Sequence, residues 1–195
     1  SDDDLLESNA IERLLLGFHN ESVSISYGPV WYIDEKGQNN NRRSFNAPRI
    51  EQGNIFLVNT LKGARIAYPC ATMFKTTSAR KVNGYPQIGP STDFGILALL
   101  AVDNSVYFNV DPIAKYRIHS QSESISEKFI LSYQKFLEWS RSSAIKDDKL
   151  KTWIHNYINQ QIYRWGRHHA LRGNKEKSIL AQSLLDLISP NLKWK

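Results

Sequence analysis

A change of pattern near residue 125 is the feature that most limits how this chain can fold. Up to residue 118, short segments in which apolar and polar residues alternate, as in strands, are separated by segments with helical spacing. From residue 126 onward only helical spacing continues, in three successive segments. The first pattern predicts an α/β domain over residues 1–125, with a mixed sheet flanked by helices. The second predicts a helical tail over residues 126–195.

The expected elements follow from these periodicities and from the turn residues between them. Gly28 and Pro29 separate the first two strands, and Gly84 closes a short helix. Expected strands lie within residues 22–28, 30–34, 70–75, 106–110 and 113–118, and expected helices lie within residues 8–20, capped by Ser8 or Asn9, 76–84 and 91–103. The polar stretch "EKGQNNNRRS", residues 35–44, predicts a loop. Residues 45–61 are compatible with a helix or with irregular structure.

Cysteine content and hydropathy limit the protein class. The single cysteine, Cys70, excludes a disulfide framework and any cysteine-based zinc site, and it fits a reducing compartment. No apolar run approaches the roughly 20 residues that a membrane span needs. We therefore expect a cytoplasmic protein without a transmembrane segment.

The tail is basic and rich in aromatic residues. Residues 126–195 contain 13 Lys or Arg against 6 Asp or Glu, within a chain of net charge +6. Tryptophans are interleaved with these cations, at Trp139, Trp153, Trp165 and Trp194. This composition suits peripheral contact with a membrane, and it suits equally a helical pair packed on the rest of the protein. Nucleic acid is the less favoured partner, since it leaves the motifs before residue 125 unexplained.

Three consecutive carboxylates, Asp2, Asp3 and Asp4, open the chain just before a predicted helix. Open α/β sheets place their ligands at such strand-to-helix junctions. Adjacent carboxylates repel one another, so a nearby cation would stabilise them, and oxygen ligands favour Mg²⁺ or Mn²⁺. The alternative is that the run is an ordinary solvated end.

Further motifs follow in a fixed order. A Tyr-Gly pair and an Ile-Asp-x-x-Gly turn come first, then Val-Asn-Gly-Tyr, then an aspartate that opens a helix, and finally Tyr-Arg-x-His-x-x-Ser-x-Ser. The matching residues are Tyr27, Gly28, Ile33, Asp34 and Gly37, then Val82, Asn83, Gly84 and Tyr85, then Asp93, and then Tyr116, Arg117, His119, Ser122 and Ser124. Together with the acidic start, this order resembles the inverting family 2 glycosyltransferases of the GT-A fold.

The resemblance implies an incomplete GT-A-like sheet. In that family a nucleotide-gripping half precedes the acidic motif, so the chain looks like the acceptor-side portion of a longer enzyme. The implied reaction moves a sugar from a nucleotide-diphosphate sugar to a hydroxyl of a saccharide or lipid-linked acceptor, as in polysaccharide biosynthesis. We expect the chain alone to transfer no sugar. An incomplete sheet would expose an edge, which a homodimer or the other half would cover.

The resemblance also implies roles for the titratable side chains. Asp93 is the implied base, and Asp2, Asp4 and His119 are the implied ligands of Mn²⁺ or Mg²⁺. The family usually has an acidic residue where Thr92 stands, which leaves that neighbour's role in doubt. The alternative for Asp93 is an ordinary aspartate at a helix N-terminus, and the alternative for His119 is a structural role.

The remaining implied contacts concern donor and acceptor. Asp3 and Arg117 are assigned to the donor side, although Arg117 is also suited to packing or pairing. Trp31 and Tyr85 are assigned to the acceptor, because their rings could stack on sugar faces, and their alternative is the core. A different class of function is also open, namely a non-catalytic carbohydrate or protein interaction module built on the same fold.

Overall fold

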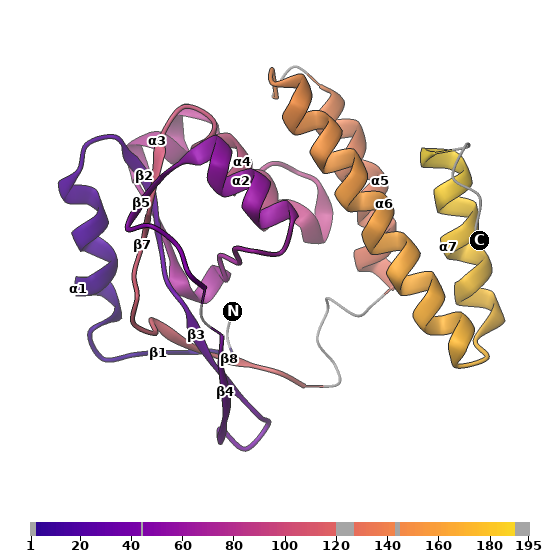
Figure 1. Cartoon of the computed structure of the whole chain (residues 1–195), viewed down its shortest axis with the longest axis horizontal. Helices are drawn as coiled ribbons and strands as arrows, with labels where there is room; N and C mark the ends of the chain where they lie inside the picture. The colour runs from indigo at the N-terminus through magenta and orange to yellow at the C-terminus, as the bar shows by residue number, and fades with distance from the viewer. Residues whose placement is uncertain (1–2, 44, 120–126, 143–144, 190–195) are drawn as a thin grey trace. The chain divides into compact units, whose positions relative to one another are not determined.

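The computed structural model describes residues 3–43, 45–119, 127–142 and 145–189 as a mixed α/β chain (Figure 1). It divides into two compact units. The first comprises residues 1–87 and 92–122, and the second comprises residues 88–91 and 123–195. The predicted boundary at residue 125 falls in the stretch 120–126, which lies outside the described residues.

The first unit contains two four-stranded sheets instead of the single sheet expected. One has the order β1 (Leu5–Leu6), β8 (Ala114–Arg117), β3 (Val30–Ile33) and β4 (Asn39–Arg43). The other has the order β5 (Ile50–Gln52), β7 (Ser105–Phe108), β2 (Val23–Tyr27) and β6 (Thr72–Phe74). Strands β3 and β8 run parallel, as do β2 and β7, and the other pairs are antiparallel. The predicted mixed α/β arrangement is confirmed at this level.

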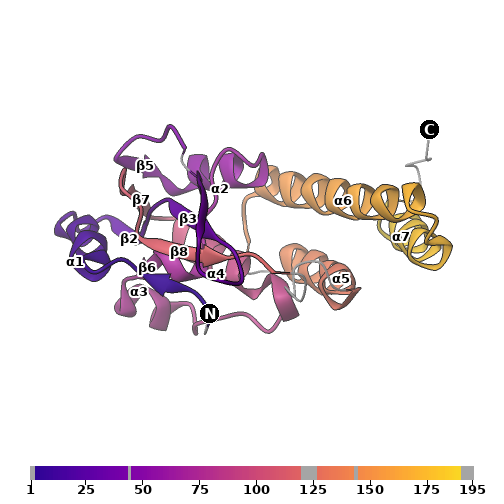
Figure 2. The same cartoon turned by 90° about the horizontal axis from the view of Figure 1, so that it is seen from below.

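Helices flank the second sheet on both sides. Helix α1 (Ala10–Leu15), extended by a 3-10 turn at Leu16–His19, lies on one side, and α2 (Gly53–Leu61) and α4 (Thr92–Ala101) lie on the other (Figures 1 and 2). All five residues of β2 are therefore buried. The short helix α3 (Thr76–Lys81) ends as predicted, with Gly84 at φ 72° and its N–H bonded to the carbonyl of Ala79.

The polar stretch 35–44 was wrongly expected to be only a loop. Its second half forms β4, which pairs with β3 as a hairpin. The turn is closed by Asp34, whose Oδ1 accepts hydrogen bonds from the N–H groups of Lys36 and Gln38, both at 2.9 Å. Gly37 takes the positive φ of 81° that this turn needs. This strand forms because its backbone pairs with that of β3, and polar side chains do not prevent such pairing.

Residues 45–61, for which the sequence is compatible with a helix or with irregular structure, form β5 and then α2. Glu51 in β5 is buried and faces the buried Arg65, whose Nη2 lies 3.1 Å from Glu51 Oε1. Asn59 in α2 donates a hydrogen bond to the same carboxylate at 3.0 Å. The carboxylate thus ties β5, α2 and the segment after α2 together.

The second unit is helical. It contains α5 (Glu127–Arg141), α6 (Asp148–Leu171) and α7 (Lys175–Ile188), which confirms the three expected helices. The turn η3 (Gly89–Ser91) packs on α5, where the hydroxyls of Ser91 and Ser132 lie 3.2 Å apart. Buried apolar side chains fill the interior, at Phe136, Ile145, Ile154, Ile158, Ile162 and Leu185. Trp194 lies outside the described residues. Within the described parts of the chain, no helix is both long and apolar enough to cross a bilayer.

The start of α6 allows a test of this unit. Asp147 caps the helix, and its Oδ1 accepts hydrogen bonds from the N–H groups of Lys149 at 2.8 Å and Leu150 at 3.1 Å. Asp147→Ala should lower the free energy of unfolding by about 1 kcal/mol, because both N–H groups lose their acceptor. Urea titration followed by circular dichroism measures the change. Lys146→Ala, at the exposed preceding residue, is the control, and an equal loss in both variants would contradict the capping role.

Candidate functional site

The acidic start of the chain meets the end of β8, more than 110 residues away in sequence. The antiparallel pairing of β1 with β8 brings them together. Asp4 Oδ1 accepts a hydrogen bond from the backbone N–H of Arg117 at 2.8 Å. His119 Nε2 lies 3.0 Å from Asp3 Oδ2. The structure therefore gathers Asp3, Asp4, Arg117 and His119, here called the acidic network. Asp2, Ser122 and Ser124 lie outside the described residues.

Arg117 holds the acidic network to the β3–β4 hairpin. Its Nε donates to the backbone carbonyl of Asp3 at 2.9 Å. Its Nη1 donates to the carbonyl of Asp34 at 2.6 Å and to that of Glu35 at 3.1 Å. These bonds join three chain segments through one guanidinium, so Arg117 positions the backbone that carries Asp3.

Asp4 also faces a thiol and a group of tyrosines. Burial, and then the nearby charge of Asp4, raises the pKa of the Cys70 thiol. Burial, and then the charge of Asp4, raises the pKa of Tyr116. The Tyr116 ring lies 4.9 Å from that of Tyr68, whose hydroxyl is hydrogen-bonded to the hydroxyl of Tyr32. The raised pKa values of the Cys70 thiol and the Tyr116 hydroxyl keep both of these groups near Asp4 neutral at pH 7.

Sequence reasoning missed the position of Cys70 near Asp4 and the packing of Tyr32 and Tyr68 on Tyr116. Tyr116 was noted only as part of a motif. Tyr32 and Tyr116 are register partners in the parallel pair β3–β8. That pairing places their side chains on one face, and the individual strand patterns do not reveal it.

Asp93 lies at the start of α4, beside a small pocket. Thr92 precedes it and donates a hydrogen bond from its hydroxyl to the carbonyl of Pro86 at 2.6 Å. The pocket has a volume of about 90 Å³, and it is lined by Ala67, Pro69, Thr72, Phe74, Tyr85, Asp93 and Leu97. Asp93 is exposed as a residue, but partial burial of its carboxyl against these side chains raises its pKa. A carboxylate held mainly by the helix dipole would have a lowered pKa instead.

Tyr85 shares this pocket. It is 50% exposed, and its ring lies 6.3 Å from that of Phe74. Burial, and then the charge of Asp93, raises the pKa of Tyr85. A half-exposed aromatic ring thus lies next to a carboxyl group with a raised pKa.

One short segment, residues 67–72, connects the pocket with the acidic network. It contains the 3-10 turn η2 (Pro69–Ala71). Ala67, Pro69 and Thr72 line the Asp93 pocket, whereas the Cys70 thiol lies close enough to Asp4 for that charge to raise its pKa. The pocket and the acidic network therefore adjoin within the first unit.

Trp31 is not brought to the Asp93 pocket. It lies in β3, where its register partners are Lys115 and Arg42. Successive side chains of a strand point to opposite faces, so Trp31 lies on the face opposite to Tyr32. The two residues assigned to the acceptor, Trp31 and Tyr85, are therefore separate in the fold.

The predicted metal ligands are only partly assembled in the described part of the chain. Within it, no three His, Cys, Asp or Glu side chains gather closely enough to hold a metal ion. The predicted metal ligands include Asp2, which lies outside the described residues. Of the ligands that are described, the Asp4 carboxylate supplies the oxygen donor that suits Mg²⁺ or Mn²⁺, whereas the His119 imidazole is a donor that suits Zn²⁺ and other transition metals better.

Comparison with known proteins gives no further assignment. No protein-family model matches the chain, and no curated protein matches its sequence.

Proposed function

We propose that the chain is the acceptor-side part of an inverting glycosyltransferase that uses a nucleotide-diphosphate sugar. The observation that carries the proposal is the junction at residues 67–72, where the Asp93 pocket adjoins the acidic network. A sugar transfer needs a base at the acceptor and a charged site at the diphosphate, and these must be neighbours. Segments far apart in the sequence supply the two sites.

Asp93 is the proposed base. In the transfer, the acceptor hydroxyl oxygen bonds to the anomeric carbon from the side opposite to the diphosphate. The bond from that carbon to the diphosphate oxygen breaks, and its electron pair leaves with the nucleoside diphosphate. The hydroxyl proton passes to the Asp93 carboxylate, which its raised pKa makes a stronger base than an ordinary aspartate. The exposed face of Tyr85 supports the acceptor sugar.

The acidic network is the proposed diphosphate side. Asp4 and His119, with Asp2, would hold Mn²⁺ or Mg²⁺, and Asp3 and Arg117 complete the donor side. When bound, the ion would neutralise charge that develops on the leaving diphosphate. Arg117 keeps the backbone of Asp3 in place, and His119 orients the Asp3 carboxylate at 3.0 Å.

The pocket at Asp93 is too small to hold a whole donor. Its volume of about 90 Å³ compares with about 300–1,000 Å³ for typical ligand pockets. We therefore expect the 195-residue chain alone to transfer no sugar and to bind nucleotide diphosphates weakly. Turnover of a sugar nucleotide by this chain would contradict the assignment of the donor site.

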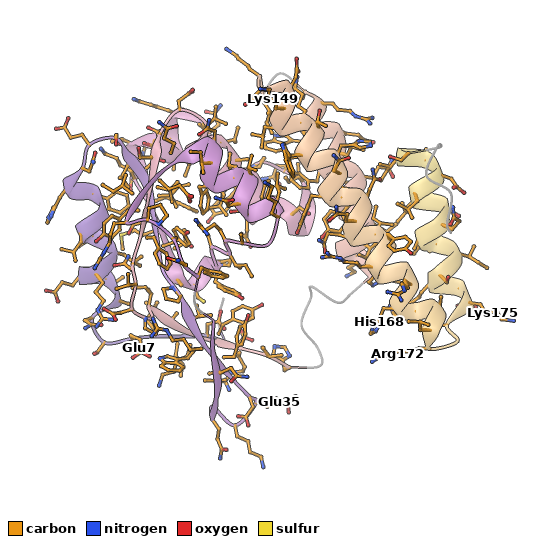
Figure 3. The ribbon with its side chains drawn as sticks, in the orientation of Figure 1. Glu7, Glu35, Lys149, His168, Arg172 and Lys175 are labelled. Carbon is orange, nitrogen blue, oxygen red and sulfur yellow. The ribbon has the colours of Figure 1, made fainter. Side chains whose placement is uncertain are left out.

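Asp4→Ala tests the diphosphate side. The substitution is made in the complete enzyme of which this chain is the proposed acceptor-side part. There, Asp4→Ala should weaken Mn²⁺-dependent binding of the nucleotide diphosphate by at least about tenfold, because one proposed carboxylate ligand is lost. Isothermal titration with and without Mn²⁺ measures the affinity. Glu7→Ala is the matched control, since Glu7 is a carboxylate three residues further along (Figure 3). Equal affinities in all three proteins would remove Asp4 from the donor site.

A further inference from the structure

The turn between α6 and α7 concentrates positive charge. Residues 164–177 contain five Lys or Arg and a single acidic residue, Glu176. Four of the cations are exposed, namely Arg164, Arg167, Arg172 and Lys175. The fifth, Lys177, lies 3.5 Å from Glu127. His168, Arg172 and Lys175 lie at the same end of this helix pair (Figure 3).

The turn also exposes large apolar side chains. Leu171, the last residue of α6, is 77% exposed, the highest value among the large apolar residues described, and Ile179 in α7 is 66% exposed. One aromatic residue of α6 two turns before Leu171, Tyr163, is 37% exposed. Such apolar and aromatic exposure beside cations is typical of surfaces that sit at a membrane interface.

The turn itself is short and well defined. Arg172 ends α6 with its N–H bonded to the carbonyl of His169, and Gly173 takes a φ of 73°. Asn174 then caps α7 by accepting a hydrogen bond from the N–H of Lys177 at 3.2 Å. The cations and Leu171 are therefore presented together on a fixed turn and not on a loose loop.

We propose that the α6–α7 turn docks on an anionic lipid bilayer. The exposed cations would face lipid phosphates and carboxylates, and Leu171 would enter the boundary between headgroups and acyl chains. A nucleic acid would use the same cations, but it offers no apolar phase for Leu171, so the exposed leucine favours the membrane. Every residue used here lies in the helical unit, so the inference is independent of the proposed sugar transfer.

Vesicle sedimentation with the full chain tests the proposal. The chain should bind vesicles of phosphatidylcholine with about 30% phosphatidylserine, and it should bind pure phosphatidylcholine much more weakly. Arg172→Gln/Lys175→Gln should lower the affinity for the anionic vesicles about 25-fold, or about fivefold for each cation removed. Leu171→Ser should lower it about tenfold, because the inserted apolar surface is lost.

A charge-matched variant is the control. Lys146→Gln/Lys149→Gln removes the same charge near the other end of α6, where Lys149 lies (Figure 3), and should change the affinity less than about twofold. All these residues are exposed, so equal circular dichroism spectra should show that every variant is folded. Equal losses in the two double variants, or an unchanged Leu171→Ser affinity, would overturn the proposal. Binding of a single-stranded RNA, lost in Arg172→Gln/Lys175→Gln, without binding of anionic vesicles would overturn it in favour of nucleic acid.

Discussion

Asp93→Asn should lower the rate of sugar transfer about 10²- to 10⁴-fold while leaving donor affinity nearly unchanged. The amide cannot accept the proton of the acceptor hydroxyl, but it keeps the size and polarity of the side chain. The rate is measured in a form of the protein that transfers sugar, together with Mn²⁺-dependent affinity for the nucleotide diphosphate. Asp103→Asn is the matched control, because Asp103 is an exposed aspartate just after the end of the same helix, and its rate should stay at that of the parent.

The pH dependence should have a fixed sign. Because the pKa of Asp93 is raised by burial, transfer should fall on acidification at a higher pH than an ordinary aspartate would give. The same shift acts on folding. A raised pKa stabilises the fold below the ordinary pKa, and this contribution is lost as the pH rises through the raised value. At pH 7 Asp93→Asn should therefore be at least as stable as the parent chain.

A purely structural Asp93 would behave differently. An aspartate that only supports the N-terminus of α4 would lose up to about 1 kcal/mol of stability on replacement by asparagine, with no loss of transfer. Urea unfolding at pH 7 and the transfer rate separate the two roles. An active Asp93→Asn enzyme would remove Asp93 from the mechanism. Metal-dependent nucleotide binding without any transfer would favour the alternative of a non-catalytic interaction module.

The elements that sequence predicted well are those fixed by local pattern. Strand β2 alternates Val23, Ile25 and Tyr27, and helix α4 follows a polar Ser-Thr-Asp start. The three tail helices repeat apolar residues at helical spacing. Side-chain periodicity decides such segments, because each must bury a continuous apolar surface.

The elements that sequence missed depend on pairing between distant segments. Strand β4 is polar throughout and exists because its backbone pairs with β3. The residues 88–91 belong to the helical unit although they lie between β6 and α4 in sequence. The division into two sheets likewise depends on which strands pair, and the composition of a single strand does not predict its pairing partner.

The candidate site shows the same division. The position of Asp93 at a helix start was predicted from its capping sequence, whereas the role that the resemblance implies for Asp4 and His119 stays a prediction. The contact of Cys70 with Asp4, and the separation of Trp31 from Tyr85, follow from strand register and from the path of residues 67–72. These features belong to the tertiary structure, so a sequence motif could not predict them.

Glu51→Ala should lower the free energy of unfolding by about 3–5 kcal/mol, because it leaves the Arg65 guanidinium buried without its counter-charge. Glu51 and Arg65 are 9% and 8% exposed, and Arg65 Nε and Nη2 donate to the two carboxylate oxygens at 3.3 and 3.1 Å. The effect matters for the site, since Arg65 lies just before residues 67–72 in the chain. Urea unfolding measures the loss of stability, and amide hydrogen exchange locates it.

Amide hydrogen exchange should show that the loss of stability is confined to the part of the fold that Glu51 holds together. Protection should fall in β5 and α2, which the Glu51 carboxylate joins through Asn59, and in residues 67–72, whereas α6 and α7 should keep theirs. Glu51→Leu/Arg65→Met is the control, because replacing both charges by apolar side chains of similar size should restore most of the stability. A double variant as unstable as Glu51→Ala would mean that lost packing, and not the unpaired guanidinium, causes the effect. A single variant within about 1 kcal/mol of the parent would mean that water reaches Arg65 and that the pair does not hold this segment.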